Sequence, residues 1–190
     1  LQNSAAITAA LPKLFTTLTA SFNLYNNYIF YNAAGIPEQL DKKWQSVQME
    51  AMQHFTFGSF YLDNYFQVQL LSDYAKHFPV YQSGHSFYLM RNLFKSALRI
   101  QTGFDFWYAT AYKGYAYNIV TGQFLLQEET LLKFTPVIDL FVNFDIKSLR
   151  FFVKFDNFSM GFFDRGYYEA PHYPMQDRTF KLGISWQLYY

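Results

Sequence analysis

The sequence contains no cysteine, which excludes disulfide bridges and thiolate metal sites. Charged residues are scarce: they make up 15% of the 190 residues, whereas a soluble domain usually carries about 25%. The net charge of +1 leaves no broad basic footprint, so we expect no nucleic-acid partner. The first residues lack a basic start followed by an apolar segment, and thus lack a signal peptide. We therefore expect a mature product or a fragment of a longer chain.

Motifs for catalysis and ligand binding are also lacking. No pair of histidines has metal-ligand spacing; the four are His54, His77, His85 and His172. Glu169 and His172 are close in sequence, but Pro171 prevents them from sharing a helical face. The sequence has no Gly-rich phosphate loop, nucleophile elbow or zinc-binding helix pattern. We expect no catalytic, cofactor-binding or metal-binding residue and no enzymatic activity.

Aromatic residues, in contrast, are abundant. They make up 23% of the chain, with 23 Phe and 17 Tyr. In residues 178–190 large apolar side chains occupy every second position: Phe180, Leu182, Ile184, Trp186, Leu188 and Tyr190. This is the period of a β-strand with a different environment on each side. The apolar side would face the core of a soluble sandwich or the lipid around a membrane barrel.

Similar alternation recurs along the chain. The predicted strands cover residues 3–11, 14–31, 46–57, 60–71, 85–94, 98–107, 138–147, 149–156 and 178–190. The uncharged stretch between Lys13 and Glu38 is long enough for a transmembrane helix. Its many Thr, Ser and Asn residues are costly in hydrocarbon, and therefore favour a strand there.

The connections between these strands alternate in length. Short ones lie near Pro12, Gly58, residues 95–97 and residues 147–148, and long ones cover residues 32–43, 73–84, 111–136 and 160–177. Outer-membrane barrels have this asymmetry. We predict a single all-β domain over residues 1–190, a transmembrane antiparallel up-and-down β-barrel of the outer-membrane type. About nine strands are visible; since bacterial barrels have even strand numbers, we expect the C-terminal part of a larger barrel. The state of residues 122–134 stays open.

The alternation also assigns side chains to the two sides of the barrel. Lipid-facing candidates are Leu140, Val142, Phe151, Val153, Leu182 and Ile184. Lumen-facing candidates are Arg99, Asp105, Asp139, Asp145, Arg150, Lys154 and Lys181. Aromatic residues predicted along one strand are Trp107, Tyr108, Tyr112, Tyr115 and Tyr117. They are consistent with sugar binding, but a girdle at the membrane interface is the more favoured interpretation.

Several segments also resemble a known family. FTPVIDLFVNFDIKSLRFFVKFDN and GYYEAPHYPMQDRTFKLGISWQLYY are similar to the C-terminal region of the putative porin family of Bacteroidetes outer membranes. The upstream segments NLFKSALRIQTGFDFWYATAYKGYAY and GQFLLQE resemble the same family in the same order, so the resemblance covers about residues 14–190. It implies a barrel in the outer membrane of a Gram-negative bacterium, acting as a diffusion channel for small solutes or as a barrel subunit of a complex. The alternatives are the barrel of a TonB-dependent transporter and a barrel enzyme.

The final strand resembles the signal that the barrel-assembly machinery reads. The matching residues are Lys181, Gly183, Trp186, Leu188 and Tyr190, although the two final tyrosines leave the register open. In the alternative interpretation, Gly183 relieves crowding inside the barrel. The expected partners are outer-membrane lipid, the assembly machinery and other outer-membrane proteins.

Overall fold

The computed structural model describes residues 2–72, 77–133, 136–163 and 168–187, and these form an all-β protein. Nine long antiparallel strands build one sheet in the order β1-β2-β5-β6-β7-β8-β11-β12-β15. Their bounds are β1 Gln2–Leu11, β2 Thr16–Tyr25, β5 Trp44–Phe57, β6 Phe60–Leu71, β7 Tyr81–Leu93, β8 Leu98–Ala109, β11 Val137–Ile146, β12 Leu149–Asp156 and β15 Thr179–Trp186. The predicted antiparallel all-β fold and its nine long strands are confirmed.

Short strands occupy the long connections. They are β3 Ile29–Tyr31, β4 Pro37–Gln39, β9 Ala116–Asn118, β10 Gln123–Leu125, β13 Tyr168–Ala170 and β14 Tyr173–Pro174. The first four form a second sheet in the order β4-β3-β10-β9, in which β10 runs parallel to β3. A 3-10 turn, Pro12–Leu14, joins β1 to β2. None of the described residues forms a helix long and apolar enough to span a membrane.

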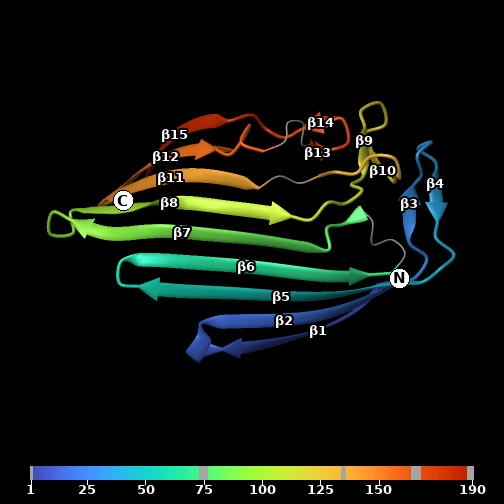
Figure 1. Ribbon diagram of the computed structural model, residues 1–190, viewed down its shortest axis with the longest axis horizontal. Coiled ribbons are helices and arrows are strands. Elements are labelled where there is room, and N and C mark those ends of the chain that lie inside the picture. Colours follow the sequence, from blue (N-terminus) through green and yellow to red (C-terminus); the bar gives the residue numbers. More distant parts are fainter. Residues whose placement is uncertain (1, 73–76, 134–135, 164–167, 188–190) are drawn as a thin grey trace.

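The sheet has two unlike ends. At one end the strands are joined by short turns, and at the other end lie the short strands β3, β4, β9, β10, β13 and β14 (Figure 1). Two of the turns contain only two residues, Gly58 with Ser59 and Lys147 with Ser148. Gly58 and Lys147 have positive φ angles of 63° and 53°, as tight hairpins require. The turn between β1 and β2 is also short, and it closes with Phe15 in the left-handed conformation.

Two predicted strand boundaries are wrong. The segment 14–31 is not one strand, because β2 ends at Tyr25 and Asn27 turns the chain with a φ of 54° before β3. The strand predicted over 85–94 begins at Tyr81, inside the connection expected over 73–84. Ser83 and His85 stand at apolar positions of this strand and hide its alternation. The connections expected over 32–43 and 160–177 lie between long strands of the sheet, and they also contain β4 and the pair β13 and β14.

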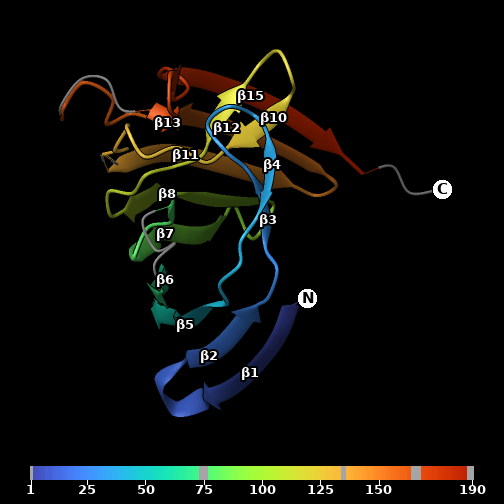
Figure 2. The ribbon, with the colours of Figure 1, turned by 90° about the vertical axis from the view of Figure 1, so that its right-hand side faces the viewer.

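The nine-stranded sheet is strongly curved, and β3 and β4 lie on its concave side (Figure 2). Within the described residues β1 and β15 each pair with one neighbour only, so the strands form an open arc. The buried apolar residues gather near the end that carries the short strands, and they include Trp44, Ala109, Leu125 and Leu132. Long apolar side chains elsewhere on the sheet are exposed, including Ile7 at 73% and Leu182 at 69%. The sheet thus presents a broad apolar surface instead of enclosing a core.

Candidate functional site

Strand register divides the long strands into one polar face and one apolar face. Asp139 pairs with Asp105, and Asp145 pairs with both Arg99 and Arg150. Lys154 pairs with Lys181. Directly paired residues point to the same side of a sheet, so all seven predicted lumen-facing residues share the polar face. Their exposure to a lumen stays a prediction.

The same register places the predicted lipid-facing residues on the opposite face. Val142 pairs with Val153, and Val153 pairs with Leu182. Phe151 pairs with Ile184. Each of these rows lies between two rows of polar-face residues, as the alternation predicts.

The polar face is the concave one. Tyr25 stacks on Trp44 with ring centroids 4.0 Å apart, and both residues lie on the polar face. Tyr28, just before β3, packs edge-on against Trp44 at 5.6 Å. Gln69, also on the polar face, donates a hydrogen bond to the carbonyl of Pro79 at 2.8 Å. The segments around the short strands therefore cover one end of the polar face.

Two ion-pair networks cover the C-terminal half of the polar face. In the first, Asp145 lies 2.6 Å from Arg150 and 3.8 Å from Arg99. In the second, Lys154 lies 3.0 Å from Asp139 and 3.1 Å from Asp156, and Lys181 contacts Asp156. The networks hold opposite charges together across β8, β11, β12 and β15. They leave few unpaired basic groups on this half of the sheet.

The N-terminal half of the polar face has mainly uncharged polar side chains. Gln48 donates to Gln69 at 3.1 Å and accepts from Ser21 at 3.4 Å. Asn23 donates to Ser46 at 3.4 Å. These hydrogen bonds link side chains on β2, β5 and β6. The N-terminal half of the polar face is therefore hydrophilic but produces no strong electrostatic field.

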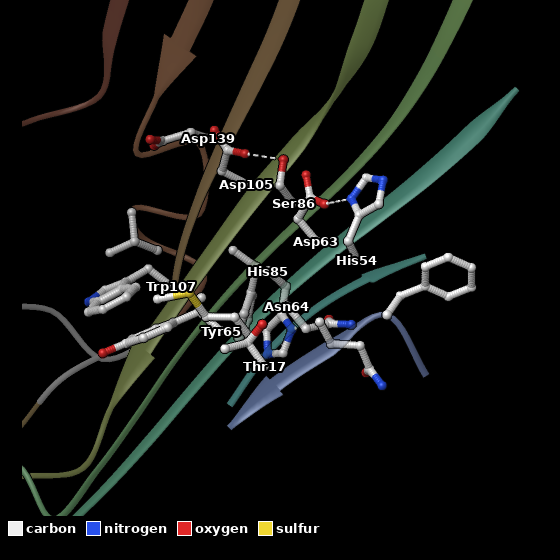
Figure 3. A pocket seen from close by; sticks show the side chains of 16 residues that line it. Thr17, His54, Asp63, Asn64, Tyr65, His85, Ser86, Asp105, Trp107 and Asp139 are labelled. Atoms are coloured by element: carbon white, nitrogen blue, oxygen red, sulfur yellow. Dashed lines mark hydrogen bonds and ion pairs between the residues drawn. The ribbon is translucent and has the colours of Figure 1, made fainter. Parts of the chain in front are cut away.

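One row of the polar face is acidic. The paired residues His54, Asp63, Ser86, Asp105 and Asp139 follow one another across β5, β6, β7, β8 and β11 (Figure 3). His54 contacts Asp63 through Nδ1, and the Ser86 hydroxyl donates to Asp105 at 2.7 Å. Within the described ranges, neither Asp63 nor Asp105 is ion-paired with Lys or Arg. This row is therefore the most negative part of the face.

Three glycines of the polar face lie close to neighbouring strands, and two of them lie against aromatic rings. An added Cβ on Gly84 would meet the Trp107 ring at 3.0 Å, and one on Gly183 would meet the Phe152 ring at 2.2 Å. At Gly103 it would come within 2.1 Å of the Phe87 carbonyl oxygen and 2.6 Å of the Tyr88 Cβ, because the backbone of β7 lies close there. At Gly84 and Gly183 the rings occupy the space that a side chain would otherwise fill. At Gly183 this contact agrees with the relief of crowding that was one of the two interpretations.

The assembly signal lies only partly in the described residues. Lys181, Gly183 and Trp186 belong to β15, while Leu188 and Tyr190 lie outside the described residues. Lys181 and Gly183 are on the polar face, and Trp186 is on the apolar face with 66% of its surface exposed. Recognition of these residues by the assembly machinery stays a prediction.

The predicted aromatic stripe is wrong as a single strand. β8 ends at Ala109, Tyr112 forms an isolated bridge with Leu132, and Tyr117 belongs to β9. Trp107 is on the polar face, whereas Tyr108 is on the apolar face, where it packs near Tyr81. Of these two residues, Tyr108 alone has the orientation that an interface girdle requires.

The segment 122–134, left open by its sequence, holds the short strand β10 and crosses the covered end of the polar face. Gln127 donates to the carbonyls of Gly114 at 2.6 Å and Thr130 at 2.9 Å. Lys113 and Glu128 form an ion pair at 2.8 Å, and Tyr28 and Tyr115 share a hydrogen bond at 3.4 Å. Burial, helped by the charge of Glu169, raises the pKa of the Tyr112 phenol. The segment is thus a packed part of the structure.

The histidines do not form a common centre. His54 contacts Asp63, His77 lies 3.4 Å from Glu128 and donates to the Lys113 carbonyl, and His85 donates to Asn64. Within 2–72, 77–133, 136–163 and 168–187, no three His, Asp or Glu side chains gather closely enough to hold a metal ion. Thr56 lies 3.3 Å from His54 Nε2, which completes an acid, imidazole and hydroxyl chain.

Sequence reasoning missed a polar row on the apolar face. Thr16, Gln53, Asn64 and His85 are consecutive partners on β2, β5, β6 and β7. Gln53 donates to Thr16 at 3.1 Å, and His85 donates to Asn64 at 2.7 Å. The hydrogen bonds lower the cost of these polar groups on an apolar surface. Polar residues at apolar positions in four successive strands were the available signal.

An antiparallel sheet with an exposed apolar face and a polar concave face belongs to the class of proteins whose sheet separates two unlike environments. The sequence model of the family described as "Putative porin" matches residues 2–190, and the chain belongs to that family. The resemblance to this family is thereby confirmed. No curated protein and no solved structure matches the chain.

Proposed function

We propose that this chain forms part of an outer-membrane β-barrel channel, with its apolar face toward lipid and its polar face toward the lumen. The observation that carries the proposal is the separation of side chains by strand register. One face of nine strands is exposed and apolar, and the other carries every ion pair described above between residues of the long strands. Membership in a family of porins supports passive passage of small solutes.

The proposal accounts for the composition. A sheet that faces lipid needs large apolar side chains on the outside and no charge there, which lowers the charged fraction of the chain. Most charged strand residues lie on the polar face, and Arg91, near a turn, is an exception that contacts Ser59. A long basic side chain close to the end of a strand can extend into the interface. The bacterial outer membrane is the location that this arrangement fits.

The charges of the polar face favour weak selection. The strand residues on this face include four basic and six acidic side chains: Arg99, Arg150, Lys154, Lys181, Glu50, Asp63, Asp105, Asp139, Asp145 and Asp156. Most of them are paired, so the field that a solute meets is modest. The excess of acids favours cations slightly, and solute size is the main criterion for passage.

The alternatives have less support. A TonB-dependent transporter would have the same kind of wall, and the match to a family described as porins favours the channel over it. A barrel enzyme would need a complete catalytic arrangement, and in the Asp63, His54 and Thr56 chain the His54 and Asp63 side chains are 51% and 44% exposed to solvent. The channel is therefore the function that the geometry supports best.

The experiment is to reconstitute the purified intact protein in planar lipid bilayers and in vesicles. We expect stepwise conductance, and swelling of vesicles by small sugars that decreases as the sugar becomes larger. Spin labels at Val142 and Asn143 report the two faces independently, with lipid contact at Val142 and water contact at Asn143. Correctly inserted protein without conductance would contradict the channel, and reversed labels would contradict the orientation.

A further inference from the structure

A hollow of about 560 Å³ lies on the polar face over the middle strands. Its lining comes from β2, β5, β6, β7, β8 and β11, and includes Met52, Asp63, Tyr65, Asp105 and Trp107 (Figure 3). This volume is in the range of small-molecule sites, which combine apolar walls with a few polar groups. The hollow is open on one side, so a solute moving along the polar face can enter it.

Two aromatic rings provide its apolar part. The rings of Tyr65 and Trp107 are nearly parallel, at 9°, with centroids 6.4 Å apart. They lie on either side of Gly84, and an added Cβ there would come within 3.0 Å of the Trp107 ring. The missing side chain is what lets the Trp107 ring lie over β7. Trp107 lies on the polar face and is 37% exposed, so a solute in the hollow can contact its ring.

The polar groups of the hollow offer mainly hydrogen-bond acceptors. The Ser86 hydroxyl already donates to Asp105, and His54 Nδ1 already contacts Asp63. Lys154 is bound to Asp139. Among the charged groups of the row, the remaining capacity belongs to the oxygens of Asp63, Asp105 and Asp139, which accept and cannot donate. Asp63 is 44% exposed, so its oxygens remain accessible.

We infer that this hollow binds small alkylammonium solutes during passage, with the ammonium group beside Asp105 and the hydrocarbon part on Trp107 and Tyr65. Asp105 and Trp107 are two residues apart on one face, about 7 Å along the strand. An ammonium group donates hydrogen bonds and accepts none, so it matches a cradle of carboxylates. The rings attract a cation and cover its apolar part. The inference rests on the proposed channel and adds a substrate class to it.

A neutral sugar matches the hollow less well. Sugar hydroxyls both donate and accept, and two donors of the hollow, the Ser86 hydroxyl and His54 Nδ1, are already engaged. The net negative charge of the row adds attraction for a cation and none for a sugar. A binding experiment can therefore distinguish an alkylammonium ion from a neutral sugar as the ligand of the hollow.

The test measures binding and transport separately. Calorimetry of n-butylammonium chloride with the detergent-solubilised intact protein reports binding without any need for conductance. Single-channel recording then reports whether n-butylammonium interrupts the current. We expect binding of n-butylammonium, concentration-dependent interruption, and much weaker effects of n-butanol and glucose. Binding without conductance would refute the channel and keep the site; conductance without binding would refute the site and keep the channel.

Two variants with matched controls locate the site. Trp107→Leu and Asp105→Asn should each weaken butylammonium binding about five- to tenfold. Their controls are Tyr108→Leu, on the opposite face, and Asp145→Asn, which removes the same charge about 20 Å away along the strands. Both controls should bind almost as the unchanged protein does. Equal loss in a variant and its control, or glucose binding more tightly than butylammonium, would overturn the inference.

Discussion

Replacement of Val142 by Arg tests the assignment of the two faces most directly. Val142 is the sixth of ten residues in β11, and its row continues to Val153 and Leu182 on the apolar face. With a rise of about 3.4 Å per residue and a tilt near 40°, the nearer end of β11 is about 10 Å away along the membrane normal. An Arg side chain is too short to place its guanidinium group in water over that distance. We expect the free energy of unfolding to fall by about 2 to 4 kcal/mol.

The matched control is Asn143→Arg, the next residue along the strand. Asn143 lies on the polar face, where it donates to Gln101 at 3.3 Å. Loss of this hydrogen bond costs about 1 kcal/mol, and the new guanidinium stays in water. Unfolding of the intact protein in lipid vesicles by urea, followed by tryptophan fluorescence, measures both variants. Equal losses at the two positions, or a larger loss at Asn143, would refute the assignment of faces.

Two further predictions concern the polar face. Gly183→Val should destabilise the folded protein by about 1 to 3 kcal/mol because its side chain collides with the Phe152 ring; the loss should shrink in a Phe152→Ala background, and an unchanged loss there would exclude this contact as the cause. Asp105→Lys and Asp139→Lys should each shift the preference of the channel from cations toward anions, read as the reversal potential in a KCl gradient. Unchanged conductance and ion preference in both would remove these positions from the lumen wall.

The fold was largely predictable because alternation is a local property. Each of the strands β5, β11 and β12 shows its two faces within its own residues, and Gly58 marks a turn that only two residues form. Prediction failed where alternation is broken, as at Ser83 and His85 of β7. It also missed the parallel pairing of Leu125 with Tyr31, which joins segments far apart in the chain. Such a contact depends on how the long connections pack together, which no local pattern contains.

The charged residues of the site were predictable one by one, but their arrangement was not. Asp105 and Asp139 were assigned to one face from the period of their own strands. The row that joins them to Asp63 depends on the register across β6, β7 and β8. A shift of one residue in any of these pairs would place Asp63 on the opposite face. The Trp107 ring lies over Gly84 because the register pairs these two residues. The hollow therefore could not be predicted without knowledge of the strand register.

The turn between β1 and β2 determines the register of the first hairpin more strongly than the sequence of β1 does. β1 consists mostly of small side chains, with Ile7 and Leu11 as its large apolar ones. Small side chains distinguish poorly between neighbouring registers. Pro12 and the left-handed Phe15 restrict the turn to one geometry, and that geometry aligns Leu11 with Thr16. Deletion of a single residue within this turn would therefore move Ile7 and Leu11 to the polar face while every strand sequence stayed intact.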